Sequence, residues 1–116
     1  MAQRKFDLDE RLLHFAVAIT SVVESLPDSK ICNHLGGQLL RSGTLPSLNY
    51  GEAQAVESKR DFIHKLGIIL EELRETINCL KILDRKSLLS DKTMIEKNNE
   101  LIAIFVKSIE TARRNS

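Results

Sequence analysis

The residues from Ser58 to Leu83 constrain the fold more than any other part of the sequence. Apolar side chains recur there every three or four positions, which is the spacing of one stripe along an α-helix. The quartet from Ser58 to Asp61 resembles a capping box, with Asp in place of the usual Glu. The segment therefore predicts a long amphipathic helix. Its stripe contains Phe62, Ile63, Leu66, Ile69, Leu70, Leu73, Ile77, Leu80 and Leu83.

Three further segments carry the same spacing of apolar residues, and short polar stretches connect them. Short connections place consecutive helices side by side and antiparallel. Asp28 follows Pro27 and is the expected N-cap of the second helix. The sequence therefore predicts an all-α protein, an antiparallel up-down four-helix bundle in a single domain over residues 1–116. The helices are expected at about residues 9–26, 28–55, 59–84 and 91–113.

Composition excludes several classes of protein. The chain has 116 residues, of which 42% are hydrophobic and 4% are aromatic. So few aromatic residues argue against an all-β protein and against a single-stranded nucleic-acid binder that works by stacking. The net charge of +1 is lower than expected for a protein that grips phosphate over its whole surface. No apolar run is long enough for a signal peptide or a membrane span, so we expect a cytoplasmic protein with no membrane partner.

The residues that usually carry chemistry stand apart from one another. None of His14, His34 and His64 lies in a metal-binding spacing such as His-x-x-x-His. The sequence has no Glu-x-x-His motif of the di-iron bundles and no phosphate-binding glycine loop. Cys32 and Cys79 are far apart, which favours reduced, semi-buried thiols. The sequence thus predicts neither an enzyme nor a metal or cofactor site.

Residues 41–53, RSGTLPSLNYGEA, combine a helix-breaking proline with several polar side chains. They could form a loop that carries a site, or a kinked helix with an internal polar network. Counted at 100° per residue along a helix, Arg41 and Glu52 share one direction, and Ser42 and Asn49 share another. We expect the helix, with a kink at the proline.

In such a kinked helix the polar side chains have structural roles. Pro46 leaves the carbonyl of Ser42 without its helical donor, and the amide of Asn49 lies within plausible reach. Asn49 should therefore face the interior, while Arg41 should pair with Glu52 or with a neighbouring subunit. A polar site for a ligand or nucleic acid, built from the same residues, is the alternative that the sequence leaves open.

Apolar residues outside the main stripes predict self-association. Ile68, Ile82, Ile104 and Val106 lie off the single stripe that a bundle core needs from each helix. A second buried face, and hence a homo-oligomer, accounts for them. Scattered apolar residues on the surface are the alternative explanation.

Basic residues gather where the predicted topology brings helix ends together. The starts of the first and third helices and the tail of the fourth lie at one end of an up-down bundle. Acidic residues, among them Glu57 and Asp61, share this end and weaken its positive field. The candidate nucleic-acid contacts at this end are Arg4, Lys5, Arg11, Lys59, Arg60, Arg113 and Arg114.

Residues 38–83 resemble a known bacterial family. A Gln-Leu-x-Arg-Ser start is followed by a downstream Asn and Glu, then by Asp-Phe and Glu-Leu-x-Glu-Thr. Over this part, about 40% of its length, the chain is similar to the four-helix-bundle family of 23S rRNA intervening-sequence proteins. It departs from the pattern at Thr44-Leu45-Pro46, where many members have Ser-Ile-Pro, and at Arg74-Glu75-Thr76, which one branch shares. The matching residues are Gln38, Leu39, Arg41, Ser42, Asn49, Glu52, Ser58, Asp61, Phe62, Glu72, Leu73, Glu75 and Thr76.

This resemblance implies a bundle that assembles into rings, typically pentamers. Some members are encoded inside insertions that interrupt 23S rRNA genes, an association that does not make them ribosomal subunit proteins. Relatives act as accessory proteins of diversity-generating retroelements, where a basic ring engages nucleic acid and a reverse transcriptase. The implied partners are therefore other copies of the chain, RNA or an RNA–DNA hybrid, and a reverse transcriptase. A protein-interaction scaffold with no nucleic-acid role is the alternative function.

Overall fold

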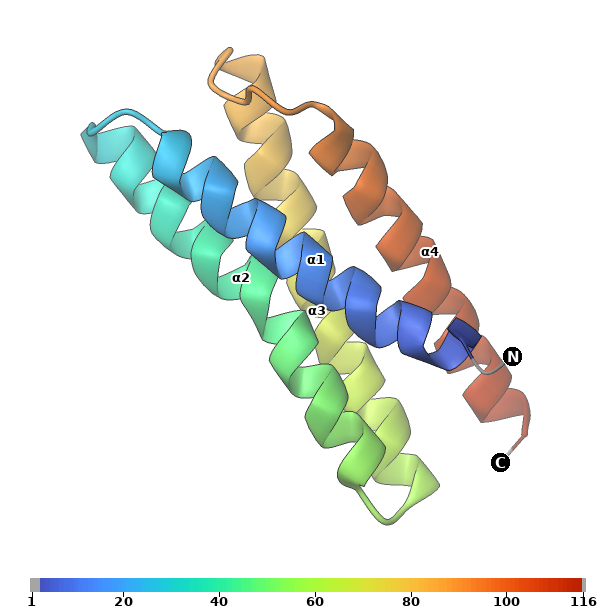
Figure 1. The fold of residues 1–116 in the computed structure, drawn as a ribbon. Helices are drawn as coiled ribbons and strands as arrows, with labels where there is room; N and C mark the ends of the chain where they lie inside the picture. Colours follow the sequence, from blue (N-terminus) through green and yellow to red (C-terminus); the bar gives the residue numbers. More distant parts are fainter. Residues whose placement is uncertain (1–2, 116) are drawn as a thin grey trace.

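The computed structural model describes the backbone of residues 3–115 and the side chains of residues 8–115. The described backbone contains no strand and four α-helices (Figure 1), namely α1 (Gln3–Ser25), α2 (Lys30–Ala55), α3 (Lys59–Arg85) and α4 (Thr93–Arg114). The predicted all-α, four-helix fold is confirmed. The first helix begins earlier than expected from its apolar stripe. Leu8 extends this stripe by one turn and packs against the core.

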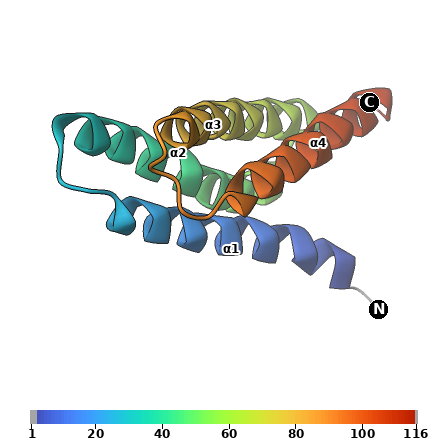
Figure 2. The same cartoon turned by 90° about the horizontal axis from the view of Figure 1, so that it is seen from above.

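Consecutive helices run in alternating directions, up and down the long axis of the molecule (Figure 1). The pairs α1–α2, α2–α3 and α3–α4 pack extensively, whereas α1 and α4 meet over a short stretch. Seen from above, α1 forms a layer on one side of α3 and α4 (Figure 2). The bundle is therefore closed least tightly between its first and last helices.

Serine side chains cap the second and third helices. Ser58 caps α3 as predicted, because its hydroxyl accepts a hydrogen bond from the N–H of Asp61 at 3.0 Å. Ser29 caps α2 by accepting from the N–H of Cys32 at 3.1 Å. The prediction of Asp28 as this cap was wrong, since Ser29 lies directly before the first helical residue, where a short side chain reaches the free N–H groups.

One cluster of apolar side chains from all four helices forms the core. The predicted stripe of α3 supplies five fully buried members of the cluster, and Phe105 of α4 is buried among them. The ring of Tyr50 packs edge-on against Phe105, with centroids 5.9 Å apart, an arrangement that aromatic pairs prefer. The five α3 residues are Leu66, Ile69, Leu73, Leu80 and Leu83.

Residues 41–53 lie inside α2, so the predicted helix is confirmed and the loop is excluded. Pro46 is buried within this continuous helix, and the kink expected there stays a prediction. A Cβ on Gly43 would lie 2.8 Å from the side chain of Ile19, so the glycine lets α1 approach α2 closely. Gly37 has no such role, because nothing described outside its own stretch of helix lies within 4 Å of its Cβ position.

Candidate functional site

The structure brings four of the predicted cations together where α3 begins and α4 ends. Lys59 and Arg60 open α3, Arg113 and Arg114 close α4, and all four are exposed. The ammonium of Lys59 donates a hydrogen bond to the backbone carbonyl of Asn115 at 2.8 Å, which holds the two helix ends beside each other. We define these four residues as the α3–α4 basic end.

A hollow of about 590 Å³ lies between α3 and α4 at this end. Arg60 and Arg113 line it, together with His64, Asp61 and Glu71. A guanidinium can bind a phosphate through two parallel hydrogen bonds, so the two arginines suit a phosphate group. The two carboxylates reduce the attraction that a single copy exerts on an anion.

Arg11 does not join the α3–α4 basic end. Its guanidinium bonds the carboxylate of Glu100 at 3.0 Å across the seam between α1 and α4. Glu100 precedes Arg113 by more than three helical turns, about 20 Å at 1.5 Å per residue. Arg11 is therefore separated from Arg113, because α1 crosses α4 well before α4 ends. The side chains of Arg4 and Lys5, also expected at this end, lie outside the described residues.

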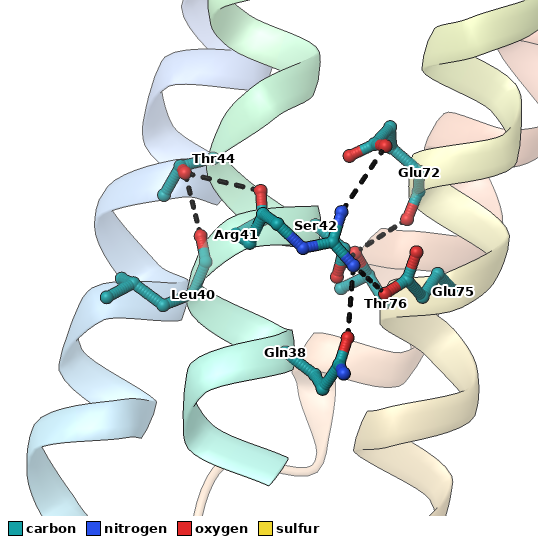
Figure 3. Close-up of polar contacts among 8 residues, drawn as sticks. All are labelled: Gln38, Leu40, Arg41, Ser42, Thr44, Glu72, Glu75 and Thr76. Atoms are coloured by element: carbon teal, nitrogen blue, oxygen red, sulfur yellow. Dashed lines mark hydrogen bonds and ion pairs between the residues drawn. The ribbon is translucent and has the colours of Figure 1, made fainter. Parts of the chain in front are cut away.

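The guanidinium of Arg41 ties α2 to α3. It contacts the carboxylate of Glu75 closely and lies 3.8 Å from that of Glu72 (Figure 3). The expected pair with Glu52 is not formed, because Glu52 instead binds the ammonium of Lys65 at 3.0 Å. Arg41 and Glu52 point in the same direction from α2, but eleven residues separate them by about 16 Å along the helix axis. Each therefore pairs with a residue of α3 and not with the other.

Ser42 and Thr76 form a buried hydroxyl pair beside this ion-pair cluster (Figure 3). Both residues are fully buried, and their side-chain oxygens are 2.8 Å apart. The Thr76 oxygen also lies 2.8 Å from the carbonyl oxygen of Glu72. Because Thr76 has one hydroxyl proton, it can donate to that carbonyl while it accepts from Ser42. Ser42 therefore joins α2 to α3 and is not a local repair at the proline.

The interior amide of the bundle is Asn98 of α4. Its Nδ2 donates a hydrogen bond to the carbonyl of Leu73 at 3.0 Å, and its Oδ1 is buried without a partner among the described groups. Asn49, expected in the interior, is half-buried, and within the described chain no hydrogen bond joins its side chain to another group. A polar residue at a core position of the apolar stripe of α4 is the signal from which Asn98 could have been identified.

Glu72 lies mostly buried at the α2–α3 seam, with its side chain 15% exposed. Burial raises the pKa of its carboxyl above the ordinary value, Arg41 opposes this, and Glu75 and Glu71 add to it. Its Oε1 is buried with no hydrogen-bond partner among the described groups. No cluster of three His, Cys, Asp or Glu side chains that could hold a metal occurs in the described residues. The contacts of Arg41 with Glu72 and Glu75 make the seam an ion-pair cluster that joins α2 to α3.

A second hollow, of about 750 Å³, follows the seam between α1 and α4. Leu13, Val17 and Ala18 contribute apolar side chains to it, and Lys97 and Glu100 contribute charged ones. It lies where the bundle is closed least tightly. As for membranes, none of the helices, as far as the structure describes them, is long and apolar enough to cross one.

Known proteins share this fold and sequence pattern. The family described as 23S rRNA-intervening sequence protein matches residues 4–108. A crystal structure of a protein with unknown function from the S23 ribosomal protein family of Bacteroides thetaiotaomicron VPI-5482 superposes with a TM-score of 0.81. The two sequences are 30% identical, over 88% of this chain and 97% of that one. No curated protein matches the sequence. With the four-helix fold and a match over most of its length, the chain belongs to the 23S rRNA-intervening sequence protein family.

Proposed function

We propose that this protein is a non-enzymatic, nucleic-acid-associated module that binds structured RNA or an RNA–DNA hybrid through the α3–α4 basic end. The observation that carries the proposal is that Arg60 and Arg113 line the same hollow, beside Lys59 and Arg114. Such duplexes have the A-form shape and are recognised mainly through shape and phosphates, which suits arginine and lysine side chains. The family description adds a link to 23S rRNA.

The proposed working form is a homo-oligomer, with the pentamer of the resemblance as the expected state. The net charge of +1 and the carboxylates of Asp61 and Glu71 make one copy a weak phosphate binder. A ring repeats the α3–α4 basic end and so multiplies the contacts to one nucleic acid. Light scattering at micromolar concentration should give the mass of several chains, and a monomer would contradict this part of the proposal.

A salt titration of RNA binding tests the proposal. Phosphate contacts release counterions, so the logarithm of the affinity should fall linearly with the logarithm of the salt concentration. Replacing Lys59, Arg60, Arg113 and Arg114 together by Ala should weaken binding to structured RNA and flatten this slope. Circular dichroism should show that the helices of this variant are intact.

A matched control removes four exposed cations from the opposite end of the bundle, where α2 begins and α3 ends. It changes the net charge by the same amount and should keep the wild-type salt slope. Equal losses in the two variants would mean that binding follows net charge and not the α3–α4 basic end. The control positions are Lys30, Lys81, Arg85 and Lys86.

A protein-interaction scaffold with no nucleic-acid role is the second candidate. Leu13, Val17, Leu40 and Leu48 favour it, since all four are large, apolar and exposed, as at many protein contacts. A reverse transcriptase is the partner that the resemblance implies. Stable binding of a purified reverse transcriptase, with no salt-sensitive RNA binding, would favour this candidate over the first.

A further inference from the structure

The outward side of α2 carries an apolar stripe that is exposed at four of its five positions and half-buried at the central one. Five of its residues point within about 40° of one direction, counted at 100° per residue. Leu40 is 42% exposed and Leu48 is 65% exposed, whereas the buried residues of α2 point to its opposite side. We define the outer stripe of α2 as Gly37, Leu40, Thr44, Leu48 and Gly51.

The outer stripe offers no charge and no free hydroxyl to a neighbour. The hydroxyl of Thr44 donates to the carbonyl of Leu40 at 2.7 Å, which leaves its methyl group for contact. Arg41 is the sole charged residue from position 37 to position 51. Its guanidinium reaches toward Glu75 of α3, away from the side on which Leu40 and Thr44 lie (Figure 3). A helix packed on the outer stripe would therefore meet no charged residue within the stripe itself, while Arg41 at its edge stays paired with Glu75.

The two glycines of the stripe have no packing role among the residues that the structure describes. Glycine within a helix costs about 1 kcal/mol relative to alanine. At Gly43 the close contact with Ile19 offsets that cost. At Gly37 and Gly51, open space surrounds the Cβ position, and no described residue comes within 4 Å. Bare backbone at both ends of the stripe is what a second helix needs to approach closely.

The outer stripe has the same spacing when it is read from either end. Gly37 and Gly51 are equally distant from Thr44 in sequence, and so are Leu40 and Leu48. Two copies of α2, packed antiparallel about a two-fold axis at Thr44, would place each Leu40 beside the Leu48 of the second copy. Each Gly37 would likewise meet a Gly51. A two-fold contact needs a patch that is complementary to itself, and this spacing meets that condition.

We propose that a second copy of this chain covers the outer stripe through an antiparallel, two-fold α2–α2 contact. The spacing of the outer stripe argues for a second copy as its occupant, because the stripe is complementary to itself under a two-fold axis. A head-to-tail contact builds a ring, whereas this contact joins copies, or whole rings, in pairs. The inference is independent of RNA binding.

Sedimentation analysis of a Leu40→Gln, Leu48→Gln double variant tests this contact. The mass of the assembly should fall twofold, whether the wild type is a pair of chains or a pair of rings. The matched control is Ile31→Gln, because Ile31 is 54% exposed on the same helix but lies about 140° from Thr44. An unchanged mass in the double variant, or an equal fall in the control, would overturn the proposal.

Crosslinking gives a second, positional test. A Thr44→Cys variant puts two thiols at the two-fold axis, so mild oxidation should link the copies in pairs. The native Cys32 and Cys79 are buried and should not take part. Adding Leu48→Gln should abolish the link, and Ile31→Cys should not form one. Equal linking of Thr44→Cys and Ile31→Cys would contradict the proposed α2–α2 contact. The Ala variant of the α3–α4 basic end should lose RNA binding and still form the Thr44→Cys link, because the two proposals are independent.

Discussion

One side of α2 carries polar residues that are bonded within the protein, and the other carries apolar residues that are exposed. Composition alone would suggest the reverse, with the polar side exposed and the apolar side buried. On the polar side, Arg41 and Ser42 are bonded to α3 through Glu75 and Thr76. On the outward side, the apolar outer stripe is exposed at four of its five positions and half-buried at Thr44. The comparison shows that polar residues in the middle of this sequence hold the fold together. The surface that we propose for a second copy is instead marked by exposed leucines and by glycines whose Cβ positions meet nothing described.

The largest change in the free energy of unfolding is expected for a substitution at Gly43, where α1 packs against α2. Gly43→Ala places a Cβ 2.8 Å from the side chain of Ile19. The free energy of unfolding should fall by about 1 to 3 kcal/mol because the core is overpacked. Gly37→Ala meets nothing and should raise that free energy by about 1 kcal/mol in the monomer, through helix propensity. Urea unfolding of both variants at monomeric concentrations measures the contrast, and equal effects would erase the difference between the two sides of α2.

The hydroxyl pair should show the next largest effect. Ser42→Ala should cost about 1 kcal/mol, since the Thr76 hydroxyl loses a buried partner. A double-mutant cycle with Thr76→Val isolates the interaction, and its coupling should be about 0.5 to 1.5 kcal/mol. Thr44→Val is the control on the outer stripe, because its hydroxyl bonds within its own helix. A coupling near zero would show that the hydroxyl pair does not join α2 to α3.

The Glu72 carboxyl should make stability depend on pH. Its pKa in the folded protein is raised above the ordinary 4.5, so between the two values the folded state binds more protons than the unfolded state. Stability should therefore fall as the pH rises through the region above 4.5, and Glu72→Gln should remove this fall. Urea unfolding at stepped pH measures it, with the exposed Glu57→Gln as control. An unaltered pH profile in Glu72→Gln would contradict the assignment.

The smallest effect is expected at Asn49. Its side chain is half-buried and lacks a hydrogen bond within the described chain, so Asn49→Leu should change the free energy of unfolding by no more than about 0.5 kcal/mol. Thermal and urea unfolding would detect a larger change. A loss of about 1 to 3 kcal/mol would show that the amide does serve the Ser42 carbonyl, as the sequence alone suggested.

The helices were predictable because helical periodicity is a local property. The stripes of α3 and α4 mark Leu73 and Phe105 as core residues, and the capping box marks Ser58 as the start of α3, without knowledge of any neighbour. The partners of Arg41 were not predictable in this way. They lie on another helix, and the relative axial position of α2 and α3 is set by packing. Asn98 was visible as a polar residue on an apolar stripe, but its acceptor, the Leu73 carbonyl, was not.

Some positions in the candidate site were likewise predictable from the sequence, and others were not. Alternating helix directions were enough to bring Arg60 and Arg113 to one end of the bundle. Arg11 was misplaced because the position at which α1 crosses α4 depends on the Gly43–Ile19 contact and on the short α1–α4 seam. Neither feature leaves a trace in the spacing of apolar residues. Topology was therefore predictable from the sequence, and the angle between helices was not.

The central claim is that the polar side of α2 serves the fold and its outward side serves assembly. The most direct test measures two quantities, unfolding free energy and assembly mass, on Ser42→Ala and on the Leu40→Gln, Leu48→Gln double variant. Ser42→Ala should lose about 1 kcal/mol of stability and keep the wild-type mass. The double variant should halve the mass and change the stability of the monomer by no more than about 0.5 kcal/mol. The reverse pattern, a mass change in Ser42→Ala with none in the double variant, would contradict the claim.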